Sequence, residues 1–463
     1  MIYEGNSARD IKIAYIGGGS RGWAWGLMSD LAKAGDINGS VYLYDIDFEA
    51  ARRNEIIGNK AGSAEGAVSD WKYKAVKTIG EALDGADFVI ISILPGTFDE
   101  MESDVHAPEK YGIYQPVGDS TGPGGIIRAL RTVPMYEEIA GAIKKHSPDA
   151  WVINYTNPMT VCVNTLYRVF PEIKAFGCCH EVFGTQKLLA SAAAELLGVE
   201  KPERREIKVN VVGVNHFTWL TEAHYRNYDL FPVYRELVNK YYEAGWSDGK
   251  DDNWLNNCFA SMQRVKFDLF RRFGCIAAAG DRHLAEFCPG DWYLSDPETV
   301  NNWKFALTPV EWRRGDLKRR LERSERLISG EEAFELRETG EDGVNQIRAL
   351  IGIEDMLTNV NIPNRGQIPN LPLGAVVETN ARFTADTVTP VLAGGLPESI
   401  YPLVARISGE QQLITRAALE RDLPLAFEAF ANDPLVRLPL AKAEELFGEM
   451  LQNTKKYLSM YKL

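Results

Sequence analysis

Two short stretches of the chain carry side chains that often bind metal ions in proteins. Gly177-Cys178-Cys179-His180 holds two thiols and an imidazole, and Gly213-Val214-Asn215-His216 holds a second imidazole. A thiolate and an imidazole that meet in the fold would bind a divalent metal and leave positions open for substrate oxygens. Spacing alone does not define such a site, because Cys179 and His216 are 37 residues apart. A histidine after a strand is also more often a hydrogen-bonded structural residue.

The two adjacent cysteines follow an apolar run that predicts a strand over residues 173–177. Neighbouring side chains on a strand point to opposite faces, so one of Cys178 and Cys179 is expected in the core and the other in a cleft. A helix starting near Glu181 would favour the thiolate form of the cysteine in the cleft. Composition does not choose between the two, and a free cysteine is most often a small buried side chain.

A glycine-rich loop follows the first predicted strand, residues 11–16. Gly17, Gly19 and Gly22 fit the pattern G-x-G-x-x-G, and a helix is expected directly after them. The first glycine makes the turn, the second admits a pyrophosphate, and the third lets helix and strand pack closely. Ser20 lies within this loop and is expected among the cofactor contacts, beside the N-terminus of the helix.

Asp45 ends the second predicted strand, residues 41–44, and lies 23 residues after Gly22. A carboxylate near that distance accepts both ribose hydroxyls of NAD and repels the 2′-phosphate of NADP. Glycines alone indicate only a tight turn, but strand, glycines, helix and acid together predict an NAD site. Asp47 is the rival for the ribose role, and its interpretation as the N-cap of the next helix is favoured.

Two further loops are expected near the cofactor. Thr121-Gly122-Pro123-Gly124-Gly125 precedes a helix that extends to about residue 145. Its glycines either let the backbone pass the nicotinamide or belong to an ordinary helix start. Asn157 follows the strand predicted at residues 151–154. It either caps the next helix, with Pro158 at the first position, or points its carboxamide into the cleft.

The elements that must position these residues alternate between strands and helices in the first half of the chain. This alternation predicts an α/β fold whose Rossmann-type, doubly wound dinucleotide-binding domain covers residues 1–200. The alternation then loosens, which predicts an α+β C-terminal domain over residues 201–463, like that of lactate and malate dehydrogenases. The apolar runs expected as parallel strands are residues 11–16, 41–44, 71–77, 88–93, 151–154 and 173–177.

Two helices are predicted in the second half from composition and periodicity. An apolar stripe predicts one helix over residues 252–273. Residues 311–340 are dense in charge and predict a helix that is either solvated or in contact with another subunit.

Composition limits the class of protein. The net charge of −13 disfavours a nucleic-acid or anionic-membrane partner, because either would need a basic surface. No apolar run of membrane-spanning length appears, and the first residues lack the basic and apolar regions of a signal peptide, so we expect neither a membrane span nor a secretory signal. Six cysteines in 463 residues do not form a disulfide framework, so we expect a cytoplasmic protein with reduced thiols.

A set of short motifs extends over most of the chain. They are Gly17-Gly18-Gly19-Ser20, Thr121-Gly122-Pro123-Gly124-Gly125, Asn154-Tyr155-Thr156-Asn157-Pro158, Cys179-His180-Glu181-Val182, Gly213-Val214-Asn215-His216-Phe217, Leu371-Pro372-Leu373 and Val376-Val377-Glu378. In combination and order, these motifs resemble glycoside hydrolase family 4, the NAD-dependent glycosidases. The stretches at residues 178–185 and 281–287 are most similar to the α-galacturonidase branch.

The resemblance implies a metal site and a substrate contact. Cys179 and His216 would bind Mn²⁺ or a similar divalent ion, which places Cys178 in the core, and Asn157 would contact the substrate. Members that act on 6-phospho-sugars carry an arginine after the strand matching residues 88–93. This chain has Leu94-Pro95-Gly96-Thr97 there, which favours a free sugar or a uronic acid. The expected assembly is a homodimer or homotetramer.

The activity implied is hydrolysis of α-glycosidic bonds, most specifically of α-D-galacturonides derived from pectin. Family members do not use the usual pair of carboxylates. A hydride instead passes from C3 of the sugar to NAD, a base removes the C2 proton, and the C1–O bond breaks by elimination. Water then adds, and the hydride returns.

The acid, base and uronate contacts are expected from residues near these motifs. Asp281 is the expected general base, and otherwise a loop aspartate beside a glycine. His180 is expected as a proton donor or as support for the metal. His283 would bind substrate or donate a proton. Arg282 would bind the uronate, and otherwise be a solvated or ion-paired arginine.

Other activities compete with this interpretation. Within the family, an α-galactosidase, α-glucosidase or α-glucuronidase would share the same motifs. A dehydrogenase of the lactate or malate type would share the nucleotide-binding half, but it would need no metal, and the pair Cys179 and His216 counts against it. A protein that only senses NAD would have no use for a metal and a base.

Overall fold

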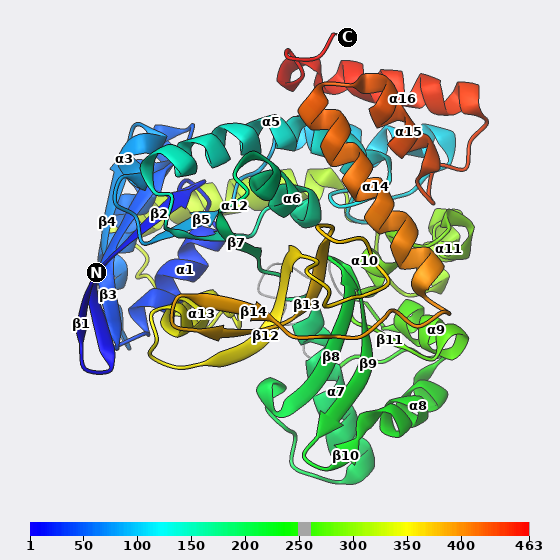
Figure 1. The fold of residues 1–463 in the computed structure, drawn as a ribbon, viewed down its shortest axis with the longest axis horizontal. Helices are drawn as coiled ribbons and strands as arrows, with labels where there is room; N and C mark the ends of the chain where they lie inside the picture. The colour runs from blue at the N-terminus through cyan, green and yellow to red at the C-terminus, as the bar shows by residue number, and fades with distance from the viewer. Residues whose placement is uncertain (249–260, 463) are drawn as a thin grey trace.

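The computed structural model describes residues 1–248 and 261–462, and its first half alternates between strands and helices (Figure 1). The strands are β1 (Ile2–Glu4), β2 (Ser7–Ile16), β3 (Ile37–Tyr44), β4 (Lys72–Val76), β5 (Phe88–Ile91), β6 (Trp151–Asn154) and β7 (Lys174–Gly177). The helices are α1 (Trp23–Ala32), α2 (Phe48–Ala61), α3 (Ile79–Leu83), α4 (Phe98–His106), α5 (Gly122–His146), α6 (Met159–Val169) and α7 (Glu181–Leu197). Short 3-10 turns cover Pro108–Tyr111 and Arg204–Glu206.

The second half mixes strands and helices less regularly. Its strands are β8 (Ile207–Val214), β9 (Phe217–Tyr225), β10 (Tyr228–Asp229), β11 (Ile276–Ala277), β12 (Met356–Pro363), β13 (Val376–Thr384) and β14 (Thr387–Pro390). Its helices are α8 (Leu230–Tyr241), α9 (Arg264–Phe273), α10 (Asp281–Glu286), α11 (Pro297–Asn302), α12 (Val310–Ser329), α13 (Gly343–Leu350), α14 (Tyr401–Glu420), α15 (Leu423–Asn432) and α16 (Leu440–Thr454). Further 3-10 turns cover Gly290–Trp292 and Lys455–Tyr457.

One large sheet runs through the molecule in the order β14-β13-β12-β7-β6-β5-β2-β3-β4. Strands β2 to β7 pair in parallel, as expected when each strand is joined to the next by a helix. The predicted doubly wound α/β fold is confirmed. The sheet also continues into the second half, because β12 pairs antiparallel with β7 at Asn361 and Gly177.

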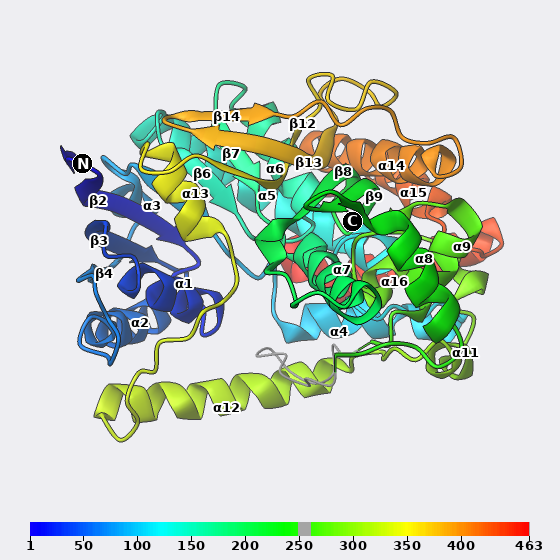
Figure 2. The same ribbon diagram turned by 90° about the horizontal axis from the view of Figure 1, so that it is seen from below.

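Apolar side chains from alternate positions of the parallel strands pack on the two faces of this sheet. On one face, Ile13 and Ile90 pack with residues of α1, α2 and α13, such as Leu31. On the other face, Ala14 and Val89 pack with residues of α3, α5 and α6. The functional loops therefore lie at the carboxyl edge of a sheet that helices cover on both sides (Figure 2).

A second, antiparallel sheet lies beside the first. Strand β9 pairs with β8, β10 and β11, and the sheet packs against α7 and α8. A third cluster of buried residues joins α5 to α14, α15 and the second sheet, so residues from both halves share one core. The division into domains at residue 200 stays a prediction.

Two of the expected helices have other bounds in the structure. The helix expected over residues 252–273 appears as α9, Arg264–Phe273, while residues 252–260 lie outside the described part of the chain. The charge-dense helix appears as α12 and ends at Ser329, where Gly330 follows with a φ of +84°. Among the described helices, none is long and apolar enough to cross a membrane.

Candidate functional site

The glycine-rich loop connects β2 to α1 at the carboxyl edge of the large sheet. Gly17 has a φ of +94°, and a Cβ atom there would lie 2.0 Å from the carbonyl oxygen of Ser92, so only glycine fits. A Cβ atom on Gly19 would meet Ala50 at 2.7 Å. The glycines thus let the loop pack closely against Ser92 and Ala50, and the loop that holds Ser20 leads through Gly22 into α1, whose N-terminal amides could meet a phosphate.

Asp45 lies against this loop. Its Oδ2 accepts a hydrogen bond from the Gly19 amide at 2.9 Å, and its Oδ1 accepts one from the Asp47 amide at 2.9 Å. Burial raises the pKa of Asp45, and the two amides lower it. Asp47 caps α2 through the Ala50 amide at 3.1 Å, which confirms the interpretation of Asp47 as an N-cap.

Three ligand-type side chains meet farther along the same edge. One ligand atom from each of Asp119, His216 and His283 lies within 4.8 Å of the others. The rings of His216 and His283 have centroids 3.8 Å apart. Ser120 links the group, because its Oγ lies 2.7 Å from Asp119 Oδ1 and 3.0 Å from His216 Nδ1. Imidazole nitrogens and a carboxylate oxygen form a donor set that suits a divalent first-row metal.

His216 occupies an unusual backbone position. It is the second residue of the two-residue connection between β8 and β9, whose ladder closes at Val214 and Phe217. Its φ is +61°, where glycine or asparagine is usual. Such a conformation costs a non-glycine residue about 1–2 kcal/mol and is found preferentially at functional sites. Burial and the neighbouring His283 lower the pKa of His216 to about 3, so the imidazole is neutral and able to bind a metal.

The carboxylates beside these rings are ionised. Burial alone would raise the pKa of Asp119, but neighbouring positive charge, including that of Arg128, and a hydrogen bond from Ser120 hold it at about 2. Burial likewise opposes ionisation of Glu181, but the neighbouring histidines, led by His283, bring its pKa to about 2. Glu181 Oε2 accepts from the Gly280 amide at 2.7 Å, and its Oε1 lies 3.7 Å from His283 Nε2.

The two adjacent cysteines face different surroundings at the end of β7. Cys178 is buried in the apolar cluster under the sheet, and its thiol lies 3.3 Å from the Gln346 side chain. Cys179 is buried on the other side, with Met159. Burial, Glu378 and Glu181 raise the pKa of the Cys179 thiol, whereas a hydrogen bond from the Asn215 side chain lowers it. Cys179 therefore lies beside the residue that precedes His216.

Asn157 turns toward the group formed by Asp119, His216 and His283, which we call the histidine group. Its Nδ2 donates to Asp119 Oδ2 at 3.2 Å, and Pro158 stands at the N-cap of α6, so Asn157 is not the cap. The peptide bond between Asn157 and Pro158 is cis. Arg128 on α5 donates to the Asn157 carbonyl oxygen at 3.1 Å. Of the two interpretations of Asn157, the cap is therefore excluded, and its role as a substrate contact stays a prediction.

His180 stands at the start of α7 and pairs with an acid from a distant segment. Its Nδ1 lies 2.8 Å from Glu341 Oε1. Burial would lower the pKa of His180, but the contact with Glu341 raises it to about 9. The rings of Trp23 and His180 have centroids 6.1 Å apart, so His180 also lies close to the start of α1 and the glycine-rich loop.

Asp281 and Arg282 are engaged in structural contacts. Asp281 is fully buried, and its Oδ1 accepts from the Lys266 amide at 3.1 Å, at the N-terminus of α9. Burial raises the pKa of Asp281 to about 6. Arg282 donates to the carbonyl oxygens of Pro116 at 2.5 Å and Ala306 at 3.2 Å, and burial lowers its pKa to about 10.

Sequence reasoning did not select Asp119, Glu181 or Glu341. Two of them had a usable signal: Glu181 follows His180 inside a quoted motif, and Asp119 precedes the Thr121 motif by two residues. An acid next to a glycine-rich loop at a strand edge is a reasonable metal-site residue. Glu341 lies 161 residues after His180 and gave no local signal.

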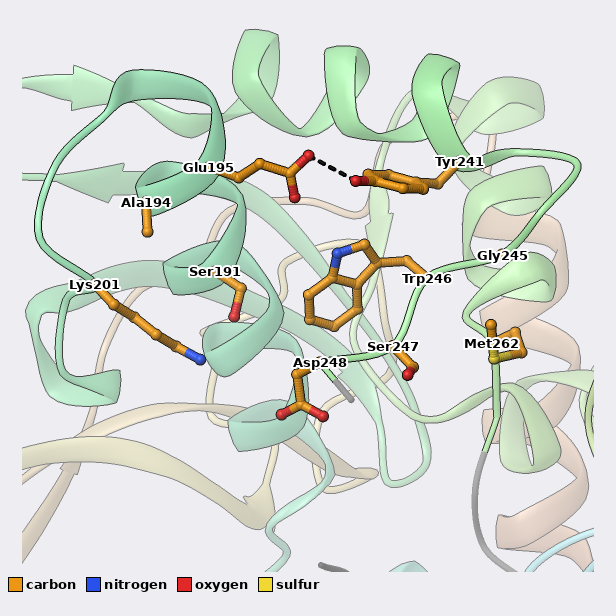
Figure 3. Close-up of a pocket in the computed structure, with 10 residues that line it drawn as sticks. All are labelled: Ser191, Ala194, Glu195, Lys201, Tyr241, Gly245, Trp246, Ser247, Asp248 and Met262. Carbon is orange, nitrogen blue, oxygen red and sulfur yellow. Dashed lines mark hydrogen bonds between the residues drawn. The ribbon is translucent and has the colours of Figure 1, made fainter. Parts of the chain in front are cut away.

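A separate hollow of about 740 Å³ lies between α7 and the end of α8 (Figure 3). Glu195 accepts a hydrogen bond from the Tyr241 hydroxyl at 2.8 Å at its rim, and the Trp246 indole stands in its wall. Glu195 follows Glu181 by 14 residues on the same helix, which corresponds to about 20 Å. This hollow is therefore distinct from the histidine group.

The chain is similar to known proteins along its whole length. It is 64% identical over 463 residues to an α-galacturonidase of Thermoanaerobacterium saccharolyticum, with both chains fully covered. It is 54% identical to an α-galacturonidase of Bacillus subtilis, covering 96% of this chain and 97% of that one. A crystal structure of a Bacillus subtilis protein described as a glucosidase matches with a TM-score of 0.91 and 54% identity, over 96% of this chain and all of that one.

Family models and a more distant structure agree with these relatives. A 6-phospho-α-glucosidase from gut microorganisms, solved with NAD and Mn²⁺, has a TM-score of 0.80 at 21% identity, with 97% and 99% of the chains covered, and shows the same fold. The model of the family 4 glycosyl hydrolases matches residues 12–195, and the model of their C-terminal domain matches residues 211–436. This chain therefore belongs to family 4 of the glycosyl hydrolases.

Proposed function

We propose that the protein is an α-galacturonidase that cleaves α-D-galacturonides with the help of NAD and a divalent metal such as Mn²⁺. The observation that carries the proposal is the 64% identity, over the whole chain, to a protein named for this activity. The side chains at residues 94–97 support it, because they provide no arginine for a sugar phosphate. α-Galactosides, α-glucosides and α-glucuronides are the competing substrates.

The residues present fit both cofactors. The glycine-rich loop packs closely against β3 and α2 and leads into the N-terminus of α1, and Asp45 lies beside it to accept ribose hydroxyls. The neutral imidazole of His216 can donate a lone pair, and Cys179 lies beside its neighbour Asn215. When bound, NAD would accept and return a hydride at C3 of the sugar, and the metal would acidify the proton on C2.

We assign the metal to Cys179 and His216. Asp119 and His283 carry ligand atoms close to that of His216, so they reach either the ion or the sugar oxygens around it. Within the described residues, Asn157 Oδ1 and His283 Nδ1 are buried without a hydrogen-bond partner. Buried polar atoms rarely remain unpaired, so a bound sugar would satisfy them.

We assign the proton transfers to His180 and Asp281. Glu341 holds His180 protonated, as a general acid requires. Asp281 has a pKa of about 6, which suits a base near neutral pH, and its Oδ2 has no hydrogen-bond partner among the described residues. Arg282 would assist uronate binding by fixing the loop that precedes Asp119, through its hydrogen bond to Pro116.

The proposal is tested with 4-nitrophenyl α-D-galacturonide, NAD, Mn²⁺ and a reducing agent, each omitted in turn. We expect release of 4-nitrophenol that stops when either cofactor is left out, with no net accumulation of NADH. Hydrolysis that persists without NAD and metal would refute the redox mechanism. Cleavage of a galactoside, glucoside or glucuronide faster than that of the galacturonide would show that the protein belongs to another branch of the family.

We also propose that the protein acts in the cytoplasm as a homodimer or homotetramer. In support, the five cysteines in the described part of the chain are free and buried, which suits a reducing compartment. The polar helix α12 offers an exposed surface for a second subunit. Light scattering on the purified protein measures the mass, and cell fractionation measures the location.

A further inference from the structure

Helix α12 lies across the nucleotide-binding half of the molecule, on the side of α1 and α2 (Figure 2). Only Val310, Ser324 and Leu327 of this helix are buried, so apolar packing contributes little to its position. The helix carries seven Lys and Arg residues against four Asp and Glu residues, in a chain whose net charge is −13. It is therefore a local concentration of positive charge beside an acidic protein's dinucleotide loop.

Polar contacts hold α12 at both ends. Near its start, Arg314 pairs with Glu102 of α4 at 2.9 Å and with Asp99 at 3.0 Å. Near its end, Lys60 of α2 donates to the carbonyl oxygens of Leu327 at 2.8 Å and Ile328 at 2.7 Å. The middle of the helix is thereby held over the start of α1.

Arg320, in the middle of α12, reaches the glycine-rich loop. Its Nη1 donates to the carbonyl oxygen of Arg21 at 3.1 Å, and its Nε donates to Asp316 at 2.6 Å. A Cβ atom placed on Gly22 would lie 2.5 Å from Nη1, so the guanidinium rests directly on the backbone where α1 begins. Asp316 aims the guanidinium, and the missing side chain of Gly22 makes room for it.

We propose that Arg320 binds the pyrophosphate of the dinucleotide, opposite the amide groups of the glycine-rich loop. A pyrophosphate carries about two negative charges, and the carboxylate of Asp45 lies beside the same loop. Arg21 in the loop already interacts with Asp45, and Arg320 adds a second cation whose guanidinium presents paired N–H donors in the geometry of phosphate oxygens. Arg320 comes from the second half of the chain and contacts the backbone of this loop directly.

The inference rests on the proposed use of NAD and assigns one further binding residue to it. The chain offers a matched control, because Arg319 also pairs with Asp316, at 3.2 Å, but points to solvent with a side chain 59% exposed. If Arg320 only fastens α12, its loss will change stability without discriminating between ligands. If it binds pyrophosphate, its loss will affect only ligands that contain phosphate.

The experiment measures the dissociation constants of NAD, ADP and adenosine by calorimetry for the wild type, Arg320→Ala, Arg320→Lys and Arg319→Ala. We expect Arg320→Ala to weaken NAD and ADP about tenfold or more and to leave adenosine unchanged, since charge-assisted hydrogen bonds are strong. Arg320→Lys should weaken NAD and ADP binding less than Arg320→Ala does, because lysine keeps the positive charge although it lacks the paired N–H donors of the guanidinium. Arg319→Ala should match the wild type. Thermal unfolding without ligand checks that each variant is folded.

Three results would overturn the inference. NAD and ADP binding unchanged in Arg320→Ala would show that the guanidinium does not reach the phosphates. Equal weakening of adenosine, ADP and NAD would show that Arg320 shapes the pocket instead. A wild type that binds no NAD would refute the proposed cofactor itself, and this inference with it; the first two results leave the proposed function intact.

Discussion

Replacing Glu286 by glutamine would separate the charge of this buried side chain from its hydrogen bonds. Glu286 ends α10, is fully buried, and accepts from the amides of Val117 at 2.7 Å and Gly118 at 3.0 Å. These amides precede Asp119, so Glu286 fixes the loop that carries one member of the histidine group. Burial raises the pKa of Glu286 from 4.5 to about 8, so the carboxyl group is protonated at pH 7.

The sign of the pH dependence follows from this raised pKa. The folded protein keeps the Glu286 proton at pH values where the unfolded chain has released it. Its contribution to stability is therefore fully present below pH 4.5 and is lost as the pH rises to about 8. The loss is about 1.4 kcal/mol for each pH unit in this window. Glutamine stays neutral throughout and still offers an oxygen to both amides.

The assay is urea unfolding of the wild type and Glu286→Gln at three pH values between 4.5 and 8. The free energy of unfolding of Glu286→Gln minus that of the wild type should increase with pH, by about 1.4 kcal/mol per unit. Glu286→Ala is the matched control for the hydrogen bonds. Alanine leaves two buried amides without a hydrogen-bond acceptor, which costs about 1–3 kcal/mol of stability for each amide. Glu286→Ala should therefore be less stable than Glu286→Gln at every pH. A constant difference between wild type and Glu286→Gln would show that the folded carboxyl has an ordinary pKa, and the reasoning would fail.

Three further predictions concern the proposed chemistry. Cys179→Ser should reduce Mn²⁺-dependent hydrolysis by about 100-fold or more, while Cys178→Ser should change it little; equal losses in a metal titration would mean that the wrong neighbour was chosen. Glu341→Gln removes the charge that raises the pKa of His180, so the alkaline limb of the kcat/KM profile should move to lower pH, and an unmoved limb would exclude His180 as the acid. Asp281→Asn should lower kcat by about 100-fold or more with little change in Tm, because asparagine also caps helices; retained kcat would leave Asp281 with its capping role alone.

The nucleotide-binding half could be predicted because its signals are local. Each parallel strand is a short apolar run, and each run is followed by a turn and a helix, so the doubly wound sheet can be read in order along the chain. The Gly17 conformation and the Asp47 cap depend on contacts with the neighbouring strand and turn. The addition of β12 to β14 to this sheet depends on a single pair, Asn361 with Gly177, between segments far apart in the sequence.

The site was predictable only where a motif marked it. His216 and His283 were selected from quoted motifs, and the structure brings their rings together. Their carboxylate neighbour Asp119 comes from a third segment, and its proximity depends on the packing of α5 against α6 and α14. Arg282 illustrates the converse case, because a basic residue near a uronate site was a sensible expectation, yet its guanidinium bonds to backbone carbonyl oxygens that no pattern reveals.

Helix α10 explains why so many of these residues depend on one another. Within six residues, Asp281 caps α9, Arg282 binds the loop at Pro116, His283 faces His216, and Glu286 binds the same loop at Val117 and Gly118. Successive positions of a helix point in different directions, so a short helix can hold several separate segments at once. Residues that share partners in this way do not contribute independently to stability. Arg282 and Glu286 both bind the loop before Asp119, so loss of either side chain already loosens the loop. The double variant should therefore lose less free energy of unfolding than the sum of the losses in the two single variants.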